Sequence, residues 1–141
     1  MKKIITILFI GFIGLSMNAQ SKVAKIQFKT DTIDYGTIEK GANGVRVFEF
    51  TNTGDAPLII SNVSSSCGCT VPSWTKEPVM PKASGTIEVK YDTKRVSPIR
   101  KTITVISNAE TPTVALKIKG DVVDTKDSSV LDKNNKSVVQ Q

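Results

Sequence analysis

The sequence predicts an all-β domain, an antiparallel β-sandwich, and three observations lead to this prediction. From Lys25 onward, apolar residues recur at every second position, which is the period of a strand with one buried face. Clusters of Gly, Pro, Asn, Asp and Ser, which favour turns, interrupt the alternation at short intervals. No window of helical length has apolar residues at positions i, i+3, i+4 and i+7, so the pattern does not predict an amphipathic helix.

Two segments show the alternation most clearly, residues 85–92 and residues 113–122. The other predicted strands are shorter apolar runs, of which the second is bent or split at Asp34-Tyr35-Gly36: residues 24–28, 32–38, 45–51, 58–63 and 100–107. The alternation predicts a shared core that contains Phe48, Phe50, Ile87, Val89, Tyr91, Leu116 and Ile118. About seven short strands in roughly 100 residues are typical of an immunoglobulin-like β-sandwich, and a small barrel is the alternative architecture.

Residues 1–19 have the three-part layout of a secretory signal peptide: a basic start, an apolar run over residues 4–15, and a small, polar stretch ending at Ala19. The apolar run is shorter than the roughly 20 residues of a membrane-spanning helix. We therefore expect cleavage after Ala19, export to the periplasm or the extracellular space, and no membrane span in the mature protein. The sandwich is then expected over residues 20–123. Residues 124–141 are polar without alternation and are expected to form a flexible tail.

The composition excludes several kinds of catalytic site. The 141 residues include no histidine, so the chain cannot build a Ser-His-Asp or Cys-His relay or a zinc site with histidine ligands. The net charge is +6, but the basic residues of the strands are single lysines at alternating positions, such as Lys90, Lys117 and Lys119. This arrangement is typical of solvated strand faces rather than of a nucleic-acid surface. The sequence therefore predicts no enzyme activity, no cofactor and no nucleic-acid partner.

Cys67 and Cys69 flank Gly68 in a Ser-Cys-Gly-Cys-Thr loop. Side chains at i and i+2 of an extended segment share a face, and an oxidising compartment favours a disulfide between them. Closing a ring of three residues stabilises the fold by only ~1.6 kcal/mol, and strained disulfides are easily reduced. The pair is therefore either structural or a redox site. A third interpretation is a Cu(I) site in which Met80 supplies a soft third ligand.

Trp74 follows the cysteines in a segment that we expect to be a loop. Either the indole packs as a lid over one end of the sandwich, or it is exposed and binds a glycan or a protein partner. Gly68 and Trp74 are accordingly candidate contacts for such a partner.

The order of these motifs resembles a known family. It starts with Phe-Glu-Phe-Thr-Asn-Thr-Gly-Asp-Ala-Pro-Leu at residues 48–58, continues with the Ser-Cys-Gly-Cys-Thr loop and the strand at 85–92, and ends with Ile-Lys-Gly at 118–120. Over residues 24–123 the chain resembles the bacterial exported family called domain of unknown function 1573, which is similar to the major-sperm-protein and Hydin-like immunoglobulin superfamily. The sequence departs from that family at three turn positions: Lys82, Ala83 and Ser97.

The resemblance implies an immunoglobulin-like fold and an envelope or extracellular setting, and it supplies no catalytic residue. We therefore expect an exported, non-catalytic binding or structural module whose partner is another envelope or extracellular protein. The alternative is a small envelope protein that exchanges thiols and disulfides, or handles Cu(I), through Cys67-Gly68-Cys69.

Overall fold

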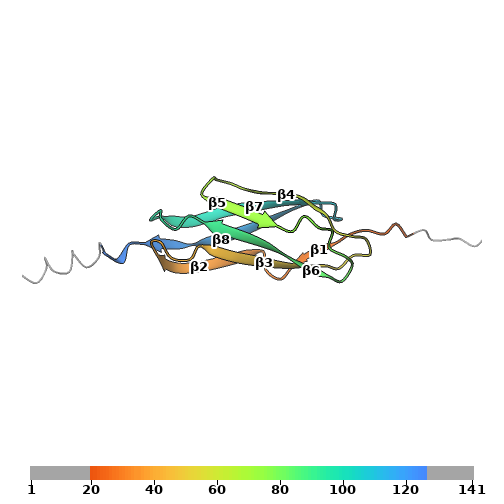
Figure 1. The fold of residues 1–141 in the computed structure, drawn as a ribbon, viewed down its shortest axis with the longest axis horizontal. Coiled ribbons are helices and arrows are strands. Elements are labelled where there is room, and N and C mark those ends of the chain that lie inside the picture. The colour runs from red at the N-terminus through yellow and green to blue at the C-terminus, as the bar shows by residue number, and fades with distance from the viewer. Residues whose placement is uncertain (1–19, 127–141) are drawn as a thin grey trace, which may run out of the picture.

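The computed structural model describes residues 20–126 and arranges them in two packed sheets. The eight strands are β1 (Ile26–Phe28), β2 (Thr32–Glu39), β3 (Val45–Asn52), β4 (Ile60–Ser65), β5 (Thr70–Trp74), β6 (Ser84–Tyr91), β7 (Pro98–Ser107) and β8 (Thr113–Val123). Figure 1 shows an elongated sandwich in which residues 20 and 126 lie at opposite ends. The predicted signal peptide and residues 127–141 of the predicted tail lie outside the described residues.

The strand order is β1-β3-β6-β5 in one sheet and β2-β8-β7-β4 in the other. The predicted immunoglobulin-like sandwich is confirmed, with β5 as a strand that the sequence analysis assigned to a loop. One pair, β2 and β8, is parallel, whereas the others are antiparallel. In the described part of the chain, no helix has the length and apolar character needed to span a membrane.

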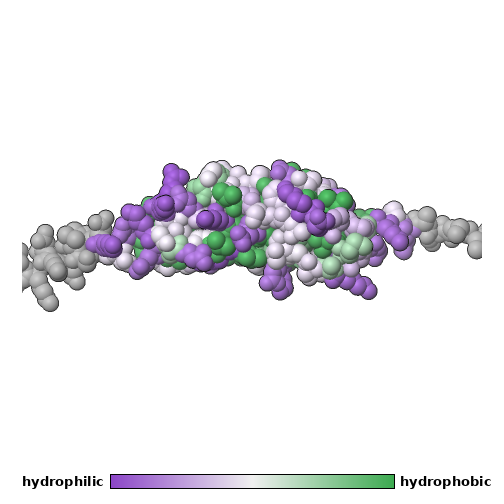
Figure 2. All heavy atoms as spheres, in the orientation of Figure 1, coloured by the Kyte–Doolittle hydropathy of each residue, from purple (hydrophilic) through white to green (hydrophobic). Residues whose placement is uncertain are grey.

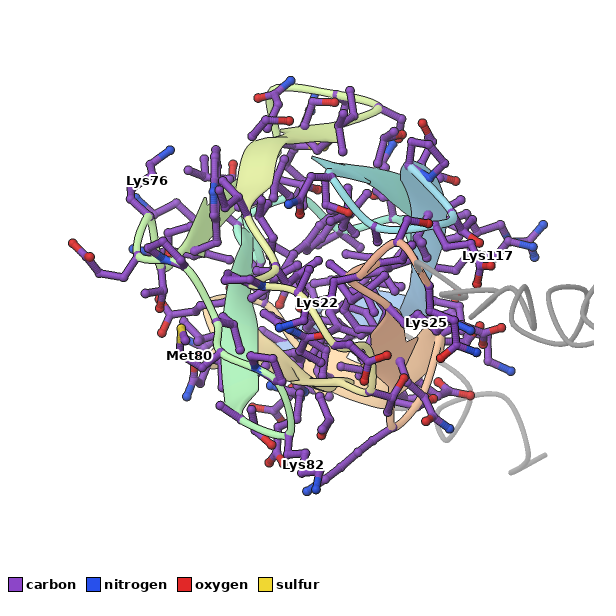
Figure 3. The ribbon with its side chains drawn as sticks, turned by 90° about the vertical axis from the view of Figure 1, so that its right-hand side faces the viewer. Lys22, Lys25, Lys76, Met80, Lys82 and Lys117 are labelled. Atoms are coloured by element: carbon purple, nitrogen blue, oxygen red, sulfur yellow. A yellow bond between two sulfur atoms is a disulfide. The ribbon has the colours of Figure 1, made fainter. Side chains whose placement is uncertain are left out.

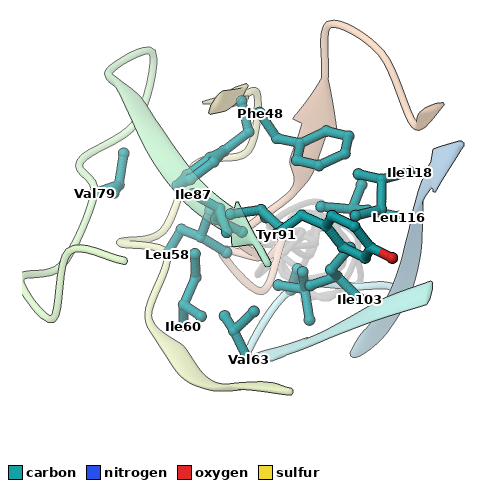
Figure 4. Packing of buried hydrophobic residues seen from close by; sticks show 14 of the residues in the cluster. Phe48, Leu58, Ile60, Val63, Val79, Ile87, Tyr91, Ile103, Leu116 and Ile118 are labelled. Atoms are coloured by element: carbon teal, nitrogen blue, oxygen red, sulfur yellow. The ribbon is translucent and has the colours of Figure 1, made fainter. Parts of the chain in front are cut away.

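The core lies between the sheets, and Figure 4 shows its side chains converging from both layers. All seven predicted core residues are buried. They are joined by further buried apolar residues at both ends of the sandwich, including Leu58, Ile60, Ile99, Ile103 and Val122. On the face drawn in Figure 2, apolar residues form separate small patches among polar ones. The buried apolar side chains of residues 20–126 form one cluster between the sheets.

Strand β2 bends where the sequence predicted a bend. The register with β8 shifts between Asp34 and Thr37, and Gly36 has a φ of 63°. Gly120 lies on β8, the neighbouring strand of the same sheet. A Cβ atom on Gly120 would lie 2.7 Å from the Gly36 carbonyl oxygen, so only glycine permits the two backbones to come this close. The bulge turns Tyr35 into the sandwich, where its hydroxyl donates to the Gly44 carbonyl at 2.8 Å.

Asn52 is the polar centre of the opposite end of the sandwich. Its side chain is fully buried, and its Nδ2 donates to the carbonyls of Ala56 at 2.8 Å and Val79 at 2.9 Å. Its Oδ1 accepts from the amides of Lys25 at 3.3 Å and Gly54 at 3.0 Å. One side chain thus joins four backbone groups from the N-terminal segment, the β3–β4 turn and the segment before β6.

The turn before β6 contains a strained residue. The Ala83 amide donates to the Met80 carbonyl at 3.0 Å, and Pro81 and Lys82 lie between them. Lys82 has a φ of 68°. Proline followed by a residue of positive φ is the pattern of a type II turn, in which glycine is favoured at the third position. This turn therefore places a lysine at a position where glycine would be free of strain.

Lys82→Gly is expected to raise the free energy of unfolding by about 0.5–1 kcal/mol, because glycine adopts the left-handed conformation without a steric cost. Urea denaturation monitored by fluorescence measures the change. The control is Lys117→Gly within β8, which should lower the free energy of unfolding by about 0.5–1 kcal/mol. A loss of stability in Lys82→Gly similar to that in the control would contradict the assigned turn.

Candidate functional site

The Cys-Gly-Cys segment is the connection between the two sheets. Strand β4 ends at Ser65 in one sheet, and β5 begins at Thr70 in the other. The Ser65 hydroxyl lies 2.6 Å from the carbonyl oxygens of both Cys67 and Thr70. The Ser66 amide donates to the Thr102 carbonyl at 3.0 Å. Hydrogen bonds therefore hold this short crossover in place at what we call the disulfide end of the sandwich.

The sulfur atoms of Cys67 and Cys69 are joined in a disulfide that closes a ring of three residues. Both cysteines are half-buried, and Cys69 packs against the core. The Thr70 Oγ1 lies 3.9 Å from the Cys67 Sγ and 4.0 Å from the Cys69 Sγ. Thr70 is only 2% exposed, so a buried hydroxyl lies beside both sulfurs. Whether the pair is structural or a redox site stays a prediction.

An open groove lies beside the disulfide, with a volume of about 800 Å³. Its lining comes from three segments: residues 41–45, residues 68–71 without the buried Thr70, and residues 90–94. Val45, Lys90 and Val71 form one row across β3, β6 and β5, because Lys90 pairs with both valines. Val71 is 62% exposed. The groove thus has an apolar floor with a lysine at its centre and a wall formed by the disulfide loop.

The groove carries an excess of positive charge. Lys90 and Lys94 both line it, and within residues 20–126 neither has a carboxylate at ion-pair distance. The lining includes one carboxylate, Asp92, whose Oδ1 accepts from the Lys94 amide at 3.1 Å. The arrangement suits a ligand with an apolar group and a negative charge.

The buried side chain of Tyr35 supports the groove wall formed by residues 41–44 from the side of the core. Its phenol donates to the Gly44 carbonyl, and the Arg46 guanidinium lies 4.2 Å from the centroid of its ring. Burial raises the pKa of Tyr35, and the opposing effect of Arg46 is smaller. The phenol therefore remains a neutral hydrogen-bond donor at neutral pH.

Trp74 does not lie in a loop or over the end of the sandwich, as the sequence analysis expected. It is the last residue of β5 and pairs with Ile87. Its Nε1 donates to the Ile60 carbonyl of β4 at 3.3 Å, and the Lys76 Nζ lies 3.3 Å from the centroid of its indole ring. Trp74 therefore closes the lateral edge between the two sheets. Among the predicted loop contacts, Gly68 lines the groove and Trp74 does not.

Met80 is not brought to the cysteines. Met80 follows Val79, which forms a β-bridge with Leu58, two residues before β4 begins. Cys67 lies beyond the opposite end of β4, two residues after Ser65. Figure 3 shows Met80 at the end of the molecule that carries Lys22 and Lys82. The three-ligand Cu(I) site proposed from Cys67, Cys69 and Met80 is therefore wrong, because the length of a strand separates the thioether from the sulfurs. No group of three or more His, Cys, Asp or Glu side chains that could hold a metal ion occurs among residues 20–126.

Sequence analysis identified the cysteines and Gly68 but missed the rest of the groove. Val71 and Lys90 lie far apart in the chain, and only the β5–β6 pairing makes them neighbours. The available signal was the alternation of Thr70-Val71-Pro72-Ser73-Trp74, which matches a short edge strand.

Comparisons with solved structures support the fold. A protein of unknown function from Porphyromonas gingivalis W83 is 18% identical, with a TM-score of 0.62 over 70% of this chain and 46% of that chain. This chain therefore spans less than half the length of that protein. PapD-like domain 7 (ASH / PapD-like) of human CEP192 is 11% identical, with a TM-score of 0.61 over 73% of this chain and 88% of that one. The CupB2 chaperone of Pseudomonas aeruginosa is 10% identical, with a TM-score of 0.51 over 78% of this chain and 61% of that one.

These likenesses show a shared sandwich fold and carry no activity with them. No curated protein sequence matches the chain. A family model does match, and its description is "protein of unknown function (DUF1573)". The match runs from residue 26 to residue 122, close to the range over which the sequence motifs show the resemblance. Because this model covers more than half of the chain, the protein belongs to the DUF1573 family.

Proposed function

We propose that this protein is an exported, non-catalytic module that binds another envelope or extracellular protein through the groove at the disulfide end. The observation that carries the proposal is the row Val45–Lys90–Val71, in which two valines flank a lysine without a carboxylate partner in the described chain. An exposed apolar side chain beside an unpaired charge is a common feature of a protein-binding surface. The absence of histidine from the sequence supports a role in binding rather than catalysis.

The groove favours a partner segment with two features. An apolar side chain of the partner would cover Val71 and Val45, and a carboxylate of the partner would lie near Lys90 and Lys94. The floor of the groove consists of β-strand residues, and a rigid scaffold limits the entropy that is lost on binding. The neighbour CupB2 is named a chaperone, so a sandwich of similar fold occurs in a protein of that kind.

Export is supported by two features of the chain. Residues 1–19 have the layout of a signal peptide, and Cys67 and Cys69 form a disulfide, which is typical of oxidising compartments. The partner is therefore to be sought in the envelope fraction and the culture medium rather than in the cytoplasm.

The double variant Val71→Asp/Lys90→Glu is expected to reduce partner capture by about tenfold or more, because it removes the apolar contact and reverses the central charge. The measurement is affinity capture from solubilised envelope and from medium with the immobilised mature protein. Captured proteins are identified by mass spectrometry and then tested individually for their Kd.

The matched control is Ile59→Asp/Lys117→Glu, which makes the same chemical changes at exposed positions outside the groove. We expect it to capture the same partner with unchanged affinity. Equal capture by the wild type and the groove variant would contradict the proposed site, and so would equal loss in both variants.

A further inference from the structure

The hydroxyl of Thr70 has an unusual set of neighbours. Among the described residues, its hydrogen-bond partners are the two sulfurs of the disulfide, at 3.9 and 4.0 Å. Buried hydroxyls normally have stronger oxygen or nitrogen partners. A thiolate is a much better acceptor than a disulfide sulfur, because hydrogen bonds to ionised groups are stronger. The Thr70 hydroxyl would therefore gain a stronger hydrogen bond when the disulfide opens.

Lys101 is a second group whose positive charge would stabilise a thiolate. It pairs with the core residue Ile118 and stands two residues from each of the buried Ile99 and Ile103. Side chains two residues apart in a strand share a face, so Lys101 lies on the inner face of β7. Its side chain is half-buried, and within residues 20–126 no carboxylate lies at ion-pair distance from it. A half-buried lysine without a counter-charge loses hydration and gains no ion pair in exchange.

The sheet register brings the segments that carry Lys101 and Cys67 to the same end of β7. Ser65 pairs with Ile103, and the next two residues are joined by two hydrogen bonds. The Ser66 amide donates to the Thr102 carbonyl at 3.0 Å, and the Thr102 amide donates to the Ser66 Oγ at 3.2 Å. Cys67 directly follows Ser66, and Lys101 directly precedes Thr102, so this hydrogen-bonded pair is the last link before both residues. A lysine beside a cysteine lowers the pKa of the thiol.

Hydrogen bonds hold the Cys-Gly-Cys loop in place independently of the disulfide. Its carbonyls are held by the Ser65 hydroxyl and by the Asp92 amide, which donates to the Cys69 carbonyl at 2.9 Å. None of these hydrogen bonds involves a sulfur atom. Cys69 is half-buried and lines the open groove, so the groove is the side from which a reagent reaches the disulfide loop.

We propose that Cys67-Gly68-Cys69 is a reversible thiol–disulfide exchange site whose reduced form is stabilised by Thr70 and Lys101, and whose co-reactant is a dithiol. This goes beyond the proposed binding function and depends on different atoms. A thiolate of the dithiol attacks the Cys69 Sγ from the groove and forms a mixed disulfide. The bond between the two protein sulfurs breaks, and Cys67 leaves as a thiolate beside the Thr70 hydroxyl and Lys101.

The second thiolate of the dithiol then attacks the dithiol's own sulfur in the mixed disulfide, and Cys69 leaves with the bonding electron pair. The dithiol is oxidised to a disulfide by loss of two electrons and two protons, and the protein gains both as two thiols. The reverse steps oxidise the pair again.

The test uses the mature protein equilibrated with buffers of reduced and oxidised glutathione, followed by alkylation and mass measurement. We expect both redox forms of the wild type to be populated in these buffers. Thr70→Val and Lys101→Met should each shift the equilibrium toward the disulfide by about tenfold, because each removes a group that stabilises the thiolate. The pH dependence of alkylation of the reduced protein should show a raised pKa of the Cys67 thiol in both variants.

Thr70→Ser and Lys101→Arg retain the hydroxyl and the charge and should behave like the wild type, whereas Lys117→Met serves as a charge control on the outer face. Thermal unfolding confirms that each variant is folded. A pair that stays oxidised in excess reduced glutathione would overturn the proposal, as would Thr70→Val and Lys101→Met variants indistinguishable from the wild type. Capture of a partner by Thr70→Val is expected to persist, so failure of the exchange site and failure of the binding function are distinguishable.

Discussion

Phe50→Ala is expected to lower the free energy of unfolding by about 3–5 kcal/mol, a large part of the stability of a small domain. Phe50 is 1% exposed, and its ring centroid lies 5.6 Å from that of Phe28 in β1. The ring also covers Gly85 on the paired strand so closely that a Cβ atom there would lie 2.5 Å from it. Removing the ring leaves a cavity over a glycine, which has no side chain to fill it. Urea denaturation of the purified domain measures the loss.

Glu88→Ala is the control, because Glu88 alternates with the buried Ile87 and Val89 on β6 and is exposed on the outer face. Its free energy of unfolding should stay within about 0.5 kcal/mol of the wild type. Similar losses in Phe50→Ala and Glu88→Ala would show that the inner and outer faces of the first sheet are wrongly assigned.

The sequence predicted this core well because each long strand has one buried face. Ile87, Val89 and Tyr91 alternate with polar residues over the length of β6, so the period of two is visible without any knowledge of the pairing. Strand β5 was missed for the opposite reason. Its five residues include Pro72 and directly follow the Cys-Gly-Cys loop, and those features favour a turn.

The groove and the surroundings of the disulfide could not be predicted from the sequence. The hydrogen bonds between Ser66 and Thr102, which bring Lys101 to the end of the sheet that carries Cys67, depend on the register between β7 and β4, and more than 30 residues of chain separate these strands. The placement of Val71 beside Lys90 depends on β5 crossing to the first sheet. Local patterns determine which face of a strand is buried, but long-range pairing determines which exposed residues become neighbours.

Asn52 shows the same limit for a single side chain. The sequence around Gly54 favours a turn, and in the structure the chain bends at residues 54–56, just after β3 ends at Asn52. Nothing in the local pattern shows that the amide of Asn52 points into the core and contacts Val79, 27 residues away. The contribution of Asn52 to stability is visible only in the structure, where the segment between β5 and β6 lies against the β3–β4 turn and its Val79 carbonyl accepts from the Asn52 side chain.

Asn52→Ala is expected to lower the free energy of unfolding by about 3–5 kcal/mol, which is comparable to the loss of a core phenylalanine. The substitution leaves four backbone groups without their partner: the amides of Lys25 and Gly54 and the carbonyls of Ala56 and Val79. Each buried polar group left unsatisfied costs about 1–3 kcal/mol, and water entering the new cavity recovers part of the total. Urea denaturation measures the change, and hydrogen exchange should show faster exchange at the Lys25 and Gly54 amides.

Two further variants separate the hydrogen bonds from the volume of the side chain. Asn52→Asp keeps the size and the two accepted hydrogen bonds but loses both donors and buries a charge, so it should be at least as destabilising as Asn52→Ala at neutral pH. Its stability should improve as the pH falls and the buried carboxylate takes up a proton, because burial raises the pKa of such a group above its value in the unfolded chain. Asn62→Ala, at an exposed position of edge strand β4, should change the free energy of unfolding by less than about 0.5 kcal/mol. If Asn52→Ala were as mild as Asn62→Ala, the four hydrogen bonds would not be what joins the turn to the core.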